Sequence, residues 1–446
     1  MLKIDWPDCV LVVLGALERA GHESWAVGGC VRDALLGREP HDWDVCTAAT
    51  PGEMRGALTG FRLLDTGEKH GTLTAMVHGA PIEITTFRAD GAYTDHRRPD
   101  GVSFVRSLRE DLARRDFTVN AILRDALTGE IVDPFGGQAD LRRGVLRAVP
   151  GDGFAEDPLR VLRGAQFAAR FRLSPDAKTL EKMRTMKTDA LSPARVLGEM
   201  KKAMASGAPD VFFDVLRRAD ALKPWFGELA ALIGVPQPPR YHPEGDAYTH
   251  SMLVLHAAAQ KKARALRPEA FVFAALTHDL GKAVSTARGE DGEWHACGHE
   301  NTGVPLTRAM LGRLGVNREI IAYCENMCRL HMRAHVCYYR RAETGETNLL
   351  FDESVCPNDL ALLAVCDTLG KGSASGGAAG EEAFLTGRVR VYEETAARGL
   401  PDGGMLLAAG MEPGPQLAEV LAAARRRALT GETAEEAVQN VLRKRQ

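Results

Sequence analysis

One string near the N-terminus, GGCVRDALLGREPHDWDV at residues 28–45, constrains the fold more than any other part of the chain. The apolar residues 25–27 predict a short strand, and a helix is predicted directly after the glycine pair. A strand, a Gly-Gly turn and a helix in this order expose backbone N–H groups at the positive end of the helix, which suits a triphosphate. We therefore expect Gly28 and Gly29 to approach phosphates, and Arg32 to add a bidentate contact from the first turn.

The same string ends in an Asp-x-Asp pair, Asp42 and Asp44, on a strand predicted at residues 41–46. Side chains alternate along a strand, so both carboxylates point to one face, about 7 Å apart, where they can share hard divalent cations such as Mg²⁺. This is the geometry of two-metal phosphoryl transfer. A lone Gly-Gly is usually a turn and a lone Asp-x-Asp a solvated strand face, but their close succession favours function. Glu83, on a following strand, is either a third carboxylate or an exposed strand residue.

The composition is that of a globular protein with several domains. The chain has 446 residues, of which 45% are hydrophobic and 26% charged, which allows roughly two to four domains. It contains neither an apolar run of about 18 residues nor a signal-peptide pattern. Nine cysteines occur without a disulfide framework, which favours free thiols. We expect a cytoplasmic protein that does not contact a membrane.

Net charge is −3, which does not by itself indicate a nucleic-acid-binding protein. Residues 140–202, however, contain 14 Lys or Arg against 8 Asp or Glu. This local excess of positive charge suits contact with an RNA backbone, although a solvated helical surface explains it equally well.

A second motif, Arg114-Arg115-Asp116, can hold phosphate and the ribose hydroxyls, although the same three residues are common on protein surfaces. Residues 156–163 (EDPLRVLR) form a further motif, in which Asp157 is a good helix N-cap ahead of a proline. Asp157, Arg160 and Arg163 are also spaced to share one helix face. A carboxylate beside a guanidinium can bind the Watson–Crick edge of a base, accepting from the amine of cytosine or adenine.

These motifs, in this order over residues 20–210, resemble polymerase-beta-type nucleotidyltransferases that extend RNA 3′ ends. In particular they are similar to class II CCA-adding enzymes and their poly(A) polymerase relatives. The resemblance implies addition of CCA to tRNA from CTP and ATP without a template, with Mg²⁺ on Asp42 and Asp44, and no DNA partner. The segment 89–100 resembles the flexible loop that full CCA-adding enzymes keep and CC-only enzymes lack. Poly(A) synthesis, or separate C- and A-adding enzymes, are the alternatives.

The chain departs from this family pattern at two places. Many members have an arginine where this chain has Gln166, and the first glutamate of their fifth motif is replaced by Ala194. What remains of that motif, Arg195 and Glu199, is spaced as an i,i+4 pair and is expected to brace a helix rather than to act in catalysis.

A second site is predicted beyond the proline-rich stretch 234–243, where adjacent His and Asp residues on an apolar helix resemble the HD metal-dependent phosphohydrolases. Lys282 could hold a phosphate there. The matching ligands for a divalent metal are His250, His278, Asp279 and Asp367, with His299 and His331 as candidates for a second ion. An idle relic of this fold is the alternative, as is a chain in which hydrolysis is the main activity and the first domain only recruits RNA. A zinc site on one helix, from Cys324, Cys328, His331 and His335, is disfavoured because four such ligands cannot close a tetrahedron.

The predicted fold class is α+β: a polymerase-beta-type head with a mixed sheet, an all-α neck and body, and a helical HD domain. The predicted domains are 1–138 (head), 139–233 (neck and body, base-selecting and RNA-binding), 244–370 (HD domain) and 381–446 (helical tail).

Overall fold

The computed structural model describes residues 6–40, 42–90, 102–372 and 377–444. The chain divides into an N-terminal unit (Met1–Ala203 and Val211–Pro224) and a C-terminal unit (Met204–Asp210 and Trp225–Gln446). The finer division into four domains stays a prediction. Among the described residues, no helix is both long enough and apolar enough to cross a bilayer.

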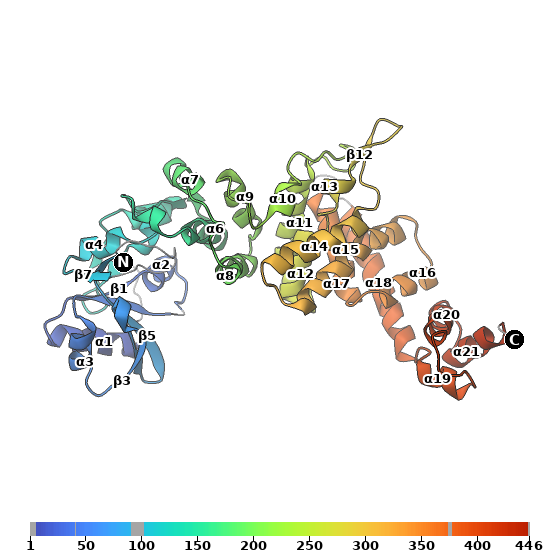
Figure 1. Ribbon diagram of the computed structural model, residues 1–446, viewed down its shortest axis with the longest axis horizontal. Coiled ribbons are helices and arrows are strands. Elements are labelled where there is room, and N and C mark those ends of the chain that lie inside the picture. Colours follow the sequence, from blue (N-terminus) through green and yellow to red (C-terminus); the bar gives the residue numbers. More distant parts are fainter. Residues whose placement is uncertain (1–5, 41, 91–101, 373–376, 445–446) are drawn as a thin grey trace. The chain divides into compact units, whose positions relative to one another are not determined.

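The N-terminal unit is built on a seven-stranded sheet with the order β3-β4-β5-β2-β1-β8-β9. Strands β1, β3 and β5 of this sheet are labelled in Figure 1. Its strands are β1 (Ser24–Val27), β2 (Asp44–Thr47), β3 (Arg62–Gly67), β4 (Thr72–Val77), β5 (Ala80–Thr86), β8 (Leu123–Arg124) and β9 (Ile131–Val132). Strands β2 and β5 run parallel, and all other neighbours are antiparallel. The sheet is therefore mixed, which confirms the predicted fold class.

Helices and two short strand pairs complete this part of the chain. The helices are α1 (Asp8–Arg19), α2 (Gly29–Leu35), α3 (Pro51–Ala57), α4 (Leu108–Ala113), α5 (Gly137–Arg143), α6 (Leu159–Phe171), α7 (Ala177–Arg184), α8 (Pro193–Met204) and α9 (Asp210–Arg218). Single 3₁₀ turns lie at η1 (Glu68–His70), η2 (Thr118–Asn120) and η3 (Gly153–Glu156). The pairs are β6 (Arg88–Asp90) with β7 (Val102–Phe104), and β10 (Val145–Leu146) with β11 (Ser174–Pro175).

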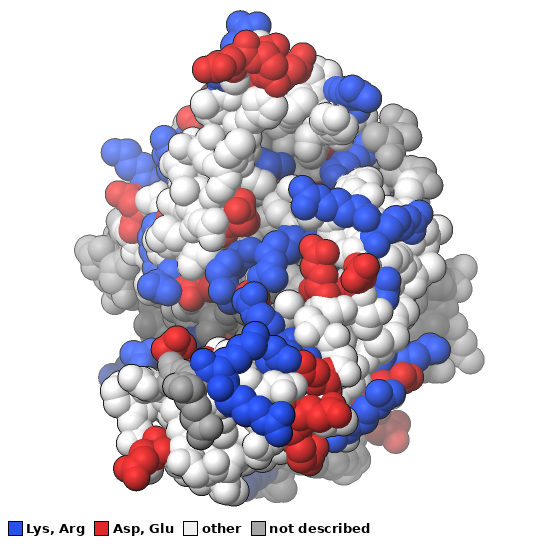
Figure 2. Space-filling model, turned by 90° about the vertical axis from the view of Figure 1, so that its right-hand side faces the viewer, with Lys and Arg blue, Asp and Glu red and all other residues white. Residues whose placement is uncertain are grey.

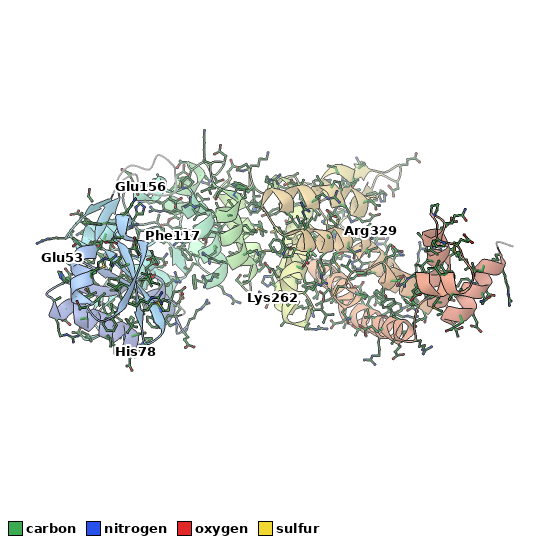
Figure 3. All side chains as sticks on the ribbon, turned by 60° about the horizontal axis from the view of Figure 1, so that its bottom comes forward. Glu53, His78, Phe117, Glu156, Lys262 and Arg329 are labelled. Atoms are coloured by element: carbon green, nitrogen blue, oxygen red, sulfur yellow. The ribbon has the colours of Figure 1, made fainter. Side chains whose placement is uncertain are left out.

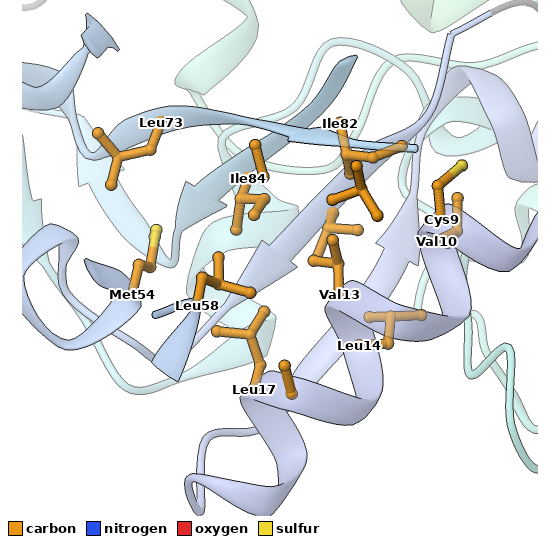
Figure 4. Packing of buried hydrophobic residues seen from close by; sticks show 14 of the residues in the cluster. Cys9, Val10, Val13, Leu14, Leu17, Met54, Leu58, Leu73, Ile82 and Ile84 are labelled. Carbon is orange, nitrogen blue, oxygen red and sulfur yellow. The ribbon is translucent and has the colours of Figure 1, made fainter. Parts of the chain in front are cut away.

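Helix α1 covers one face of the sheet (Figure 4). Val10, Val13 and Leu17 follow the spacing of a helix face and are fully buried. They pack on side chains of β4 and β5, among them Ile82 and Ile84. This core holds β5 and its parallel neighbour β2 in place, and with them the residues at the start of β2.

The structure corrects the predicted start of strand β2. The expected strand covered residues 41–46, but β2 begins at Asp44, and position 41 lies outside the described residues. The ladder to β5 starts with Trp43, whose carbonyl accepts from the amide of Glu83 at 3.3 Å. Pro40 lies just upstream and has no amide hydrogen to extend the ladder. Asp42 therefore precedes the strand and is exposed, so strand alternation does not set its direction.

Phe117 ties helix α6 to the sheet region. Its buried ring lies edge-on to Phe154 and Phe167, with centroid distances of 5.5 and 5.7 Å (Phe117 is labelled in Figure 3). A side chain at Gly164 would place its Cβ 2.9 Å from this ring, so α6 approaches it closely. The packing brings the face of α6 that carries Arg160 and Arg163 to the sheet.

Among its described residues, the C-terminal unit is helical apart from one short strand pair. Its elements are α10 (Gly227–Ala230), α11 (Ala247–Lys261), η4 (Lys262–Arg264), α12 (Pro268–Thr277), α13 (Lys282–Ser285), β12 (Ala287–Arg288), β13 (Trp294–His295), α14 (His299–Arg313), α15 (Arg318–Tyr339), α16 (Thr344–Asp352), α17 (Pro357–Gly370), α18 (Ala378–Ala397), α19 (Gly403–Ala408), α20 (Leu417–Leu429) and α21 (Ala434–Arg443). Helices α19–α21 share a small core of their own around Leu406 and Val420.

Lys262, labelled in Figure 3, donates to the carbonyl of Ser206 at 2.8 Å, which attaches residues 204–210 to this unit. On the face shown in Figure 2, Lys and Arg side chains lie among Asp and Glu side chains. This mixture agrees with the small net charge of −3.

Candidate active sites

A pocket of about 620 Å³ opens in the N-terminal unit. All nine residues predicted to bind nucleotide line it, and so does Asp44: Gly28, Gly29, Arg32, Arg114, Arg115, Asp116, Asp157, Arg160 and Arg163. Motifs that are more than a hundred residues apart in the sequence thus meet at one place. Asp42 is not part of the pocket wall.

Gly28 lines this pocket and has φ of +77° and ψ of −125°, a conformation that side chains disfavour. A Cβ atom here would sit 3.4 Å from Arg115 Nη1 and 3.9 Å from Asp44 Oδ2. Helix α2 starts at the next residue. The bare backbone therefore leaves open the space between a guanidinium and a carboxylate, where a phosphate and its cation would lie.

Three carboxylates gather at the start of β2. Asp44 and Glu83 are direct partners across the parallel ladder, and both line the pocket. Burial, followed by the charges of Glu83 and Asp42, raises the pKa of Asp44 to about 6, although Arg115 and Arg32 act in the opposite direction. Such mutual repulsion is relieved by a divalent cation, and oxygen-only donors suit Mg²⁺. The residues present therefore fit the metal predicted for this site.

The paired arginines are held by Asp111, a residue that the sequence analysis missed. Its buried carboxylate accepts from Arg114 at 2.7 Å and from Arg115 at 3.3 Å. Burial favours the neutral acid, but the charges of Arg115 and Arg114 lower the pKa of Asp111. Its spacing of three and four residues before the two arginines, on a helix, was the available signal.

The Asp116 carboxylate binds Arg163 directly and Arg32 through Asn120, a residue that was also missed. Its Oδ2 atom accepts from Arg163 at 2.7–2.8 Å, and its Oδ1 atom accepts from Asn120 at 2.9 Å. Asn120 in turn accepts from Arg32 at 2.6 Å, and the Arg32 guanidinium also lies 4.2 Å from the ring centroid of Phe171. The cationic pocket wall is thus fixed by a continuous hydrogen-bonded chain.

Asp157 and Arg160 each combine a structural contact with a place in the pocket wall. Asp157 Oδ1 accepts from the amide of Leu159 at 2.9 Å, as a helix cap does, and its Oδ2 accepts from Arg195 at 2.7 Å. Arg160 donates to the carbonyls of Gly153 and Arg114, the latter at 2.7 Å. Arg195 of the fifth motif is therefore a neighbour of the predicted base-selecting carboxylate.

The C-terminal unit brings together all six residues predicted for the HD site. Four histidine side chains surround Asp279, and every member of the cluster is buried: His250, His278, His299, His331, Asp279 and Asp367. The Nε2 atoms of His299, His278 and His331 lie 3.1–3.5 Å from the Asp279 carboxylate. His250 Nε2 lies 3.5 Å from Asp279 Oδ2 and 3.0 Å from Asp367 Oδ1.

Each of these histidines is oriented by a hydrogen bond from its other ring nitrogen. The acceptors of Nδ1 are Ala275 O for His278, Ala296 O for His299, Cys328 O for His331 and the carboxylate of Glu244 for His250, at 2.6–2.8 Å. With Nδ1 engaged, Nε2 faces the cluster, which is the usual arrangement of metal-binding histidines. Glu244 had not been predicted.

The cluster fits a divalent metal. Among the described residues, no well-directed hydrogen bond reaches the buried atoms His250 Nε2, His278 Nε2, Asp279 Oδ1 or Asp279 Oδ2. Two sets of ligand atoms, each within 4.8 Å of one another, share Asp279: His250, His278 and Asp279, and Asp279, His299 and His331. Buried polar atoms rarely converge in this way without well-directed hydrogen bonds, and a shared cation would satisfy all of them.

Electrostatics agree with this assignment. Burial lowers the pKa of His331 to about 4, so this ring is neutral and can act as a ligand. Burial opposes ionisation of Asp279, but His278 and Lys282 hold its pKa well below the ordinary value. Lys282 Nζ lies 2.6 Å from Asp279 Oδ2 and donates to Gln237 at 2.8 Å.

A cleft of about 1350 Å³ leads to this cluster, and His299, Asp367 and Lys282 line it. Its wall also carries cationic side chains, among them Arg329, which is labelled in Figure 3. Anionic substrates of considerable size can therefore reach the metal ligands.

The disfavoured zinc site is not assembled. Burial raises the pKa of the Cys328 thiol to about 12 and that of Cys324 further, and both thiols donate to carbonyl groups. His331 belongs to the Asp279 cluster, whereas His335 lies between two other carboxylates. The two cysteines are therefore buried structural thiols.

Three stretches of the chain match known protein families: the poly A polymerase head domain at residues 24–147, the probable RNA- and SrmB-binding site of polymerase A at 172–233, and the HD domain at 247–369. A multifunctional CCA protein of Burkholderia pseudomallei is 40% identical over 350 residues, which cover 73% of this chain and 78% of that protein.

Solved structures show the same fold. The CCA-adding enzyme of Bacillus stearothermophilus in complex with CTP aligns with a TM-score of 0.62 at 22% identity, over 98% of this chain and 97% of that one. The Thermotoga maritima CCA-adding enzyme complexed with tRNA aligns with a TM-score of 0.63 at 19% identity, over 100% and 97%. The 40% identity above, over 73% of this chain, shows that the chain belongs to the family of multifunctional CCA proteins.

Proposed function

We propose that the N-terminal unit adds CCA to the 3′ end of tRNA from CTP and ATP, without a nucleic-acid template. The observation that carries the proposal is the single pocket in which Gly28, Asp44 and Arg115 lie together, with Asp157 in the same wall. Family membership and the resemblance to enzymes solved with CTP and with tRNA support it.

The residues of the pocket have distinct roles in this reaction. Asp42 and Asp44 would hold Mg²⁺, which neutralises the triphosphate and lowers the pKa of the attacking 3′ hydroxyl. Gly28 leaves room for the phosphates, and Arg115 neutralises them from the side. Burial lowers the pKa of Arg32, and Asp33, at 2.8 Å, opposes this effect.

Base selection is assigned to Asp157 and Arg160. Free lone pairs of the Asp157 carboxylate accept from the exocyclic amine that cytosine and adenine share. Arg160 retains N–H donors for ring acceptors after binding two carbonyl groups. Arg195 prevents Asp157 from turning away.

The enzyme is expected to act in the cytoplasm. All nine cysteines are free, as is usual in a reducing compartment. tRNA and the two nucleotides are the partners that the proposed reaction requires.

For the C-terminal unit we propose a metal-dependent phosphohydrolase that acts on phosphate esters at RNA ends. The buried ligand atoms that converge on Asp279 at the end of a wide cleft carry this proposal. Lys282 and Arg329 supply positive charge for the substrate phosphate.

One experiment tests both activities. A tRNA that lacks its 3′ CCA is incubated with Mg²⁺ and CTP, ATP, GTP or UTP, and product length and base order are determined. Incorporation of two C and one A is expected; long A tracts on any RNA would indicate a poly(A) polymerase, and C alone or A alone a partial enzyme. Asp42→Ala should abolish addition and spare hydrolysis of an RNA 3′ phosphate, whereas Asp279→Ala should do the reverse. Loss of both activities in each variant contradicts two separate sites.

A further inference from the structure

His335 lies between two buried carboxylates beside the HD cluster. Its Nε2 atom is 2.7 Å from Asp367 Oδ2, and its Nδ1 atom is 2.7 Å from Glu381 Oε1. The exposed fractions of His335, Asp367 and Glu381 are 3%, 4% and 0%. Since carboxylates only accept, both ring nitrogens serve as donors, and the three side chains form one closed hydrogen-bonded row.

Glu381 has no spare oxygen in this arrangement. Its Oε2 atom accepts from Thr368 Oγ1 at 2.5 Å, and Thr368 is the neighbour of Asp367 on α17. Two other helices therefore contact the Glu381 carboxylate of α18: α15 through His335 and α17 through Thr368. Such full satisfaction makes a buried polar row rigid.

The row leaves one oxygen of Asp367 for the cluster. Oδ2 is engaged by His335, so the carboxylate cannot rotate freely, and Oδ1 stays 3.0 Å from His250 Nε2. Asp367 is the one predicted ligand outside the three-residue groups that share His250 or Asp279. Its direction consequently depends on contacts behind it.

We propose that His335 and Glu381 are positioning residues that fix Asp367 as a metal ligand, so that α18 is a working part of the HD centre. This proposal rests on the proposed hydrolase function and extends it. Helix α18 lies beyond residues 247–369, the stretch that matches the HD domain. The metal centre thus includes a residue that the domain match does not contain.

The test measures binding of Co²⁺ to the full-length chain by calorimetry and by its visible absorption. To keep the head from contributing, all variants carry Asp44→Asn. Glu381→Gln retains the shape of the side chain but cannot accept with both oxygens, and we expect it to weaken Co²⁺ binding about 10- to 100-fold and to change the absorption. Glu382→Gln is the matched control, because its carboxylate pairs with Arg264 at 2.5 Å on the surface and lies next in sequence.

Each outcome decides the proposal. Equal Co²⁺ affinity and spectra for Glu381→Gln and Glu382→Gln would overturn it, as would a parent protein that binds no Co²⁺ at this cluster. If circular dichroism shows that Glu381→Gln does not fold, His335→Asn replaces it in the test. Asn cannot donate to Glu381 and Asp367 as the two ring nitrogens of His335 do, so the same loss of Co²⁺ binding is expected. A parent that binds Co²⁺ but cleaves no RNA phosphate refutes the hydrolase function alone, since the binding measurement stands apart from turnover.

Discussion

Gly28 and Gly37 flank the same short helix, yet the structure gives them different roles. Both have positive φ, +77° and +68°, so alanine at either position strains the backbone by about 1–3 kcal/mol. Only at Gly28 does the added carbon meet functional groups, at 3.4 Å from Arg115 Nη1, whereas nothing lies within 4 Å at Gly37.

We predict that Gly28→Ala lowers kcat/KM for CTP addition by at least about tenfold more than Gly37→Ala, the loss of roughly one good contact. Both variants should lose comparable stability in urea unfolding. Equal kinetic losses would show that Gly28 serves only the turn.

Burial of Asp44 in the nucleotide pocket lowers the stability of the folded protein at neutral pH. In the metal-free protein its pKa of about 6 exceeds the unfolded value of 3.8, so the folded state holds the proton more tightly. The contribution of this group to stability therefore falls as pH rises from about 4 to 6 and stays low above that range.

Asp44→Asn should accordingly stabilise the metal-free protein by about 1–3 kcal/mol at pH 8, and the difference should vanish below pH 4 while nucleotide addition is abolished at every pH. Urea unfolding in EDTA at several pH values measures it. A variant that is less stable at pH 8 would contradict the pKa assignment.

The sequence predicted the site residues that belong to motifs, but not the residues that orient those side chains by hydrogen bonds. Gly28, Asp44 and Asp157 stand in recognisable strings. Glu244 lies only six residues before its partner His250 but belongs to no recognised motif, whereas Asn120 is an ordinary polar residue whose partner Arg32 comes from a distant segment. Local spacing carries no information about such tertiary hydrogen bonds.

At the scale of elements, close packing of α13 and α14 places His299. A Cβ atom at Gly281 would lie 2.0 Å from the carbonyl oxygen of His299 and 2.7 Å from the amide of Gly303. These are backbone atoms, so the two helices would have to separate. The position of His299, a proposed metal ligand, therefore depends on the absence of a side chain at Gly281.

We predict that Gly281→Ala weakens Co²⁺ binding at the HD cluster at least tenfold, roughly the loss seen when residues that orient metal ligands are displaced. Nucleotide addition should stay within twofold of the parent. Gly312→Ala is the control, since it lies in α14 with nothing within 4 Å. An unchanged Co²⁺ affinity in Gly281→Ala would argue that the cluster tolerates movement of α14.

Element boundaries were predicted less well than element types. The strand that carries Asp44 was expected at residues 41–46, but it starts at residue 44. The pattern of alternation cannot show where ladder partners end, because that depends on β5. The charge of Asp42 nevertheless contributes to the raised pKa of Asp44, so the two carboxylates lie close enough to interact.

At the scale of the whole molecule, the predicted head with its mixed sheet and the helical HD part are confirmed. Their sites lie in different compact units, each with its own ligand set. Ligands should therefore act locally. The sequence alone indicated two chemistries because it contains two different motifs, Asp-x-Asp and His-Asp, and their distance in the chain indicated two separate sites.

We predict that CTP with Mg²⁺ slows hydrogen exchange in β2 and around α2, and that Co²⁺ slows exchange in α12 and α17 when Asp44 is replaced by Asn. Binding stabilises only states that hold the ligand. Exchange followed by mass spectrometry at peptide resolution tests this. Protection of both regions by either ligand alone would mean that the two centres are energetically coupled.

The pairing of β6 with β7 has a practical consequence for redesign. Asp90 and Val102 face each other in the last rung of this ladder, and Arg88 at its base lines the nucleotide pocket. Opposed residues of an antiparallel pair can be joined by a two-residue Asn-Gly turn. Excising residues 91–101 in this way should leave the hairpin stem intact and yield a shortened enzyme that stops after two cytidines, as sequencing of its tRNA products would reveal. A terminal adenosine added at the parent's rate would mean that the excised stretch is dispensable for changing nucleotide, and the gene could then be trimmed there without loss.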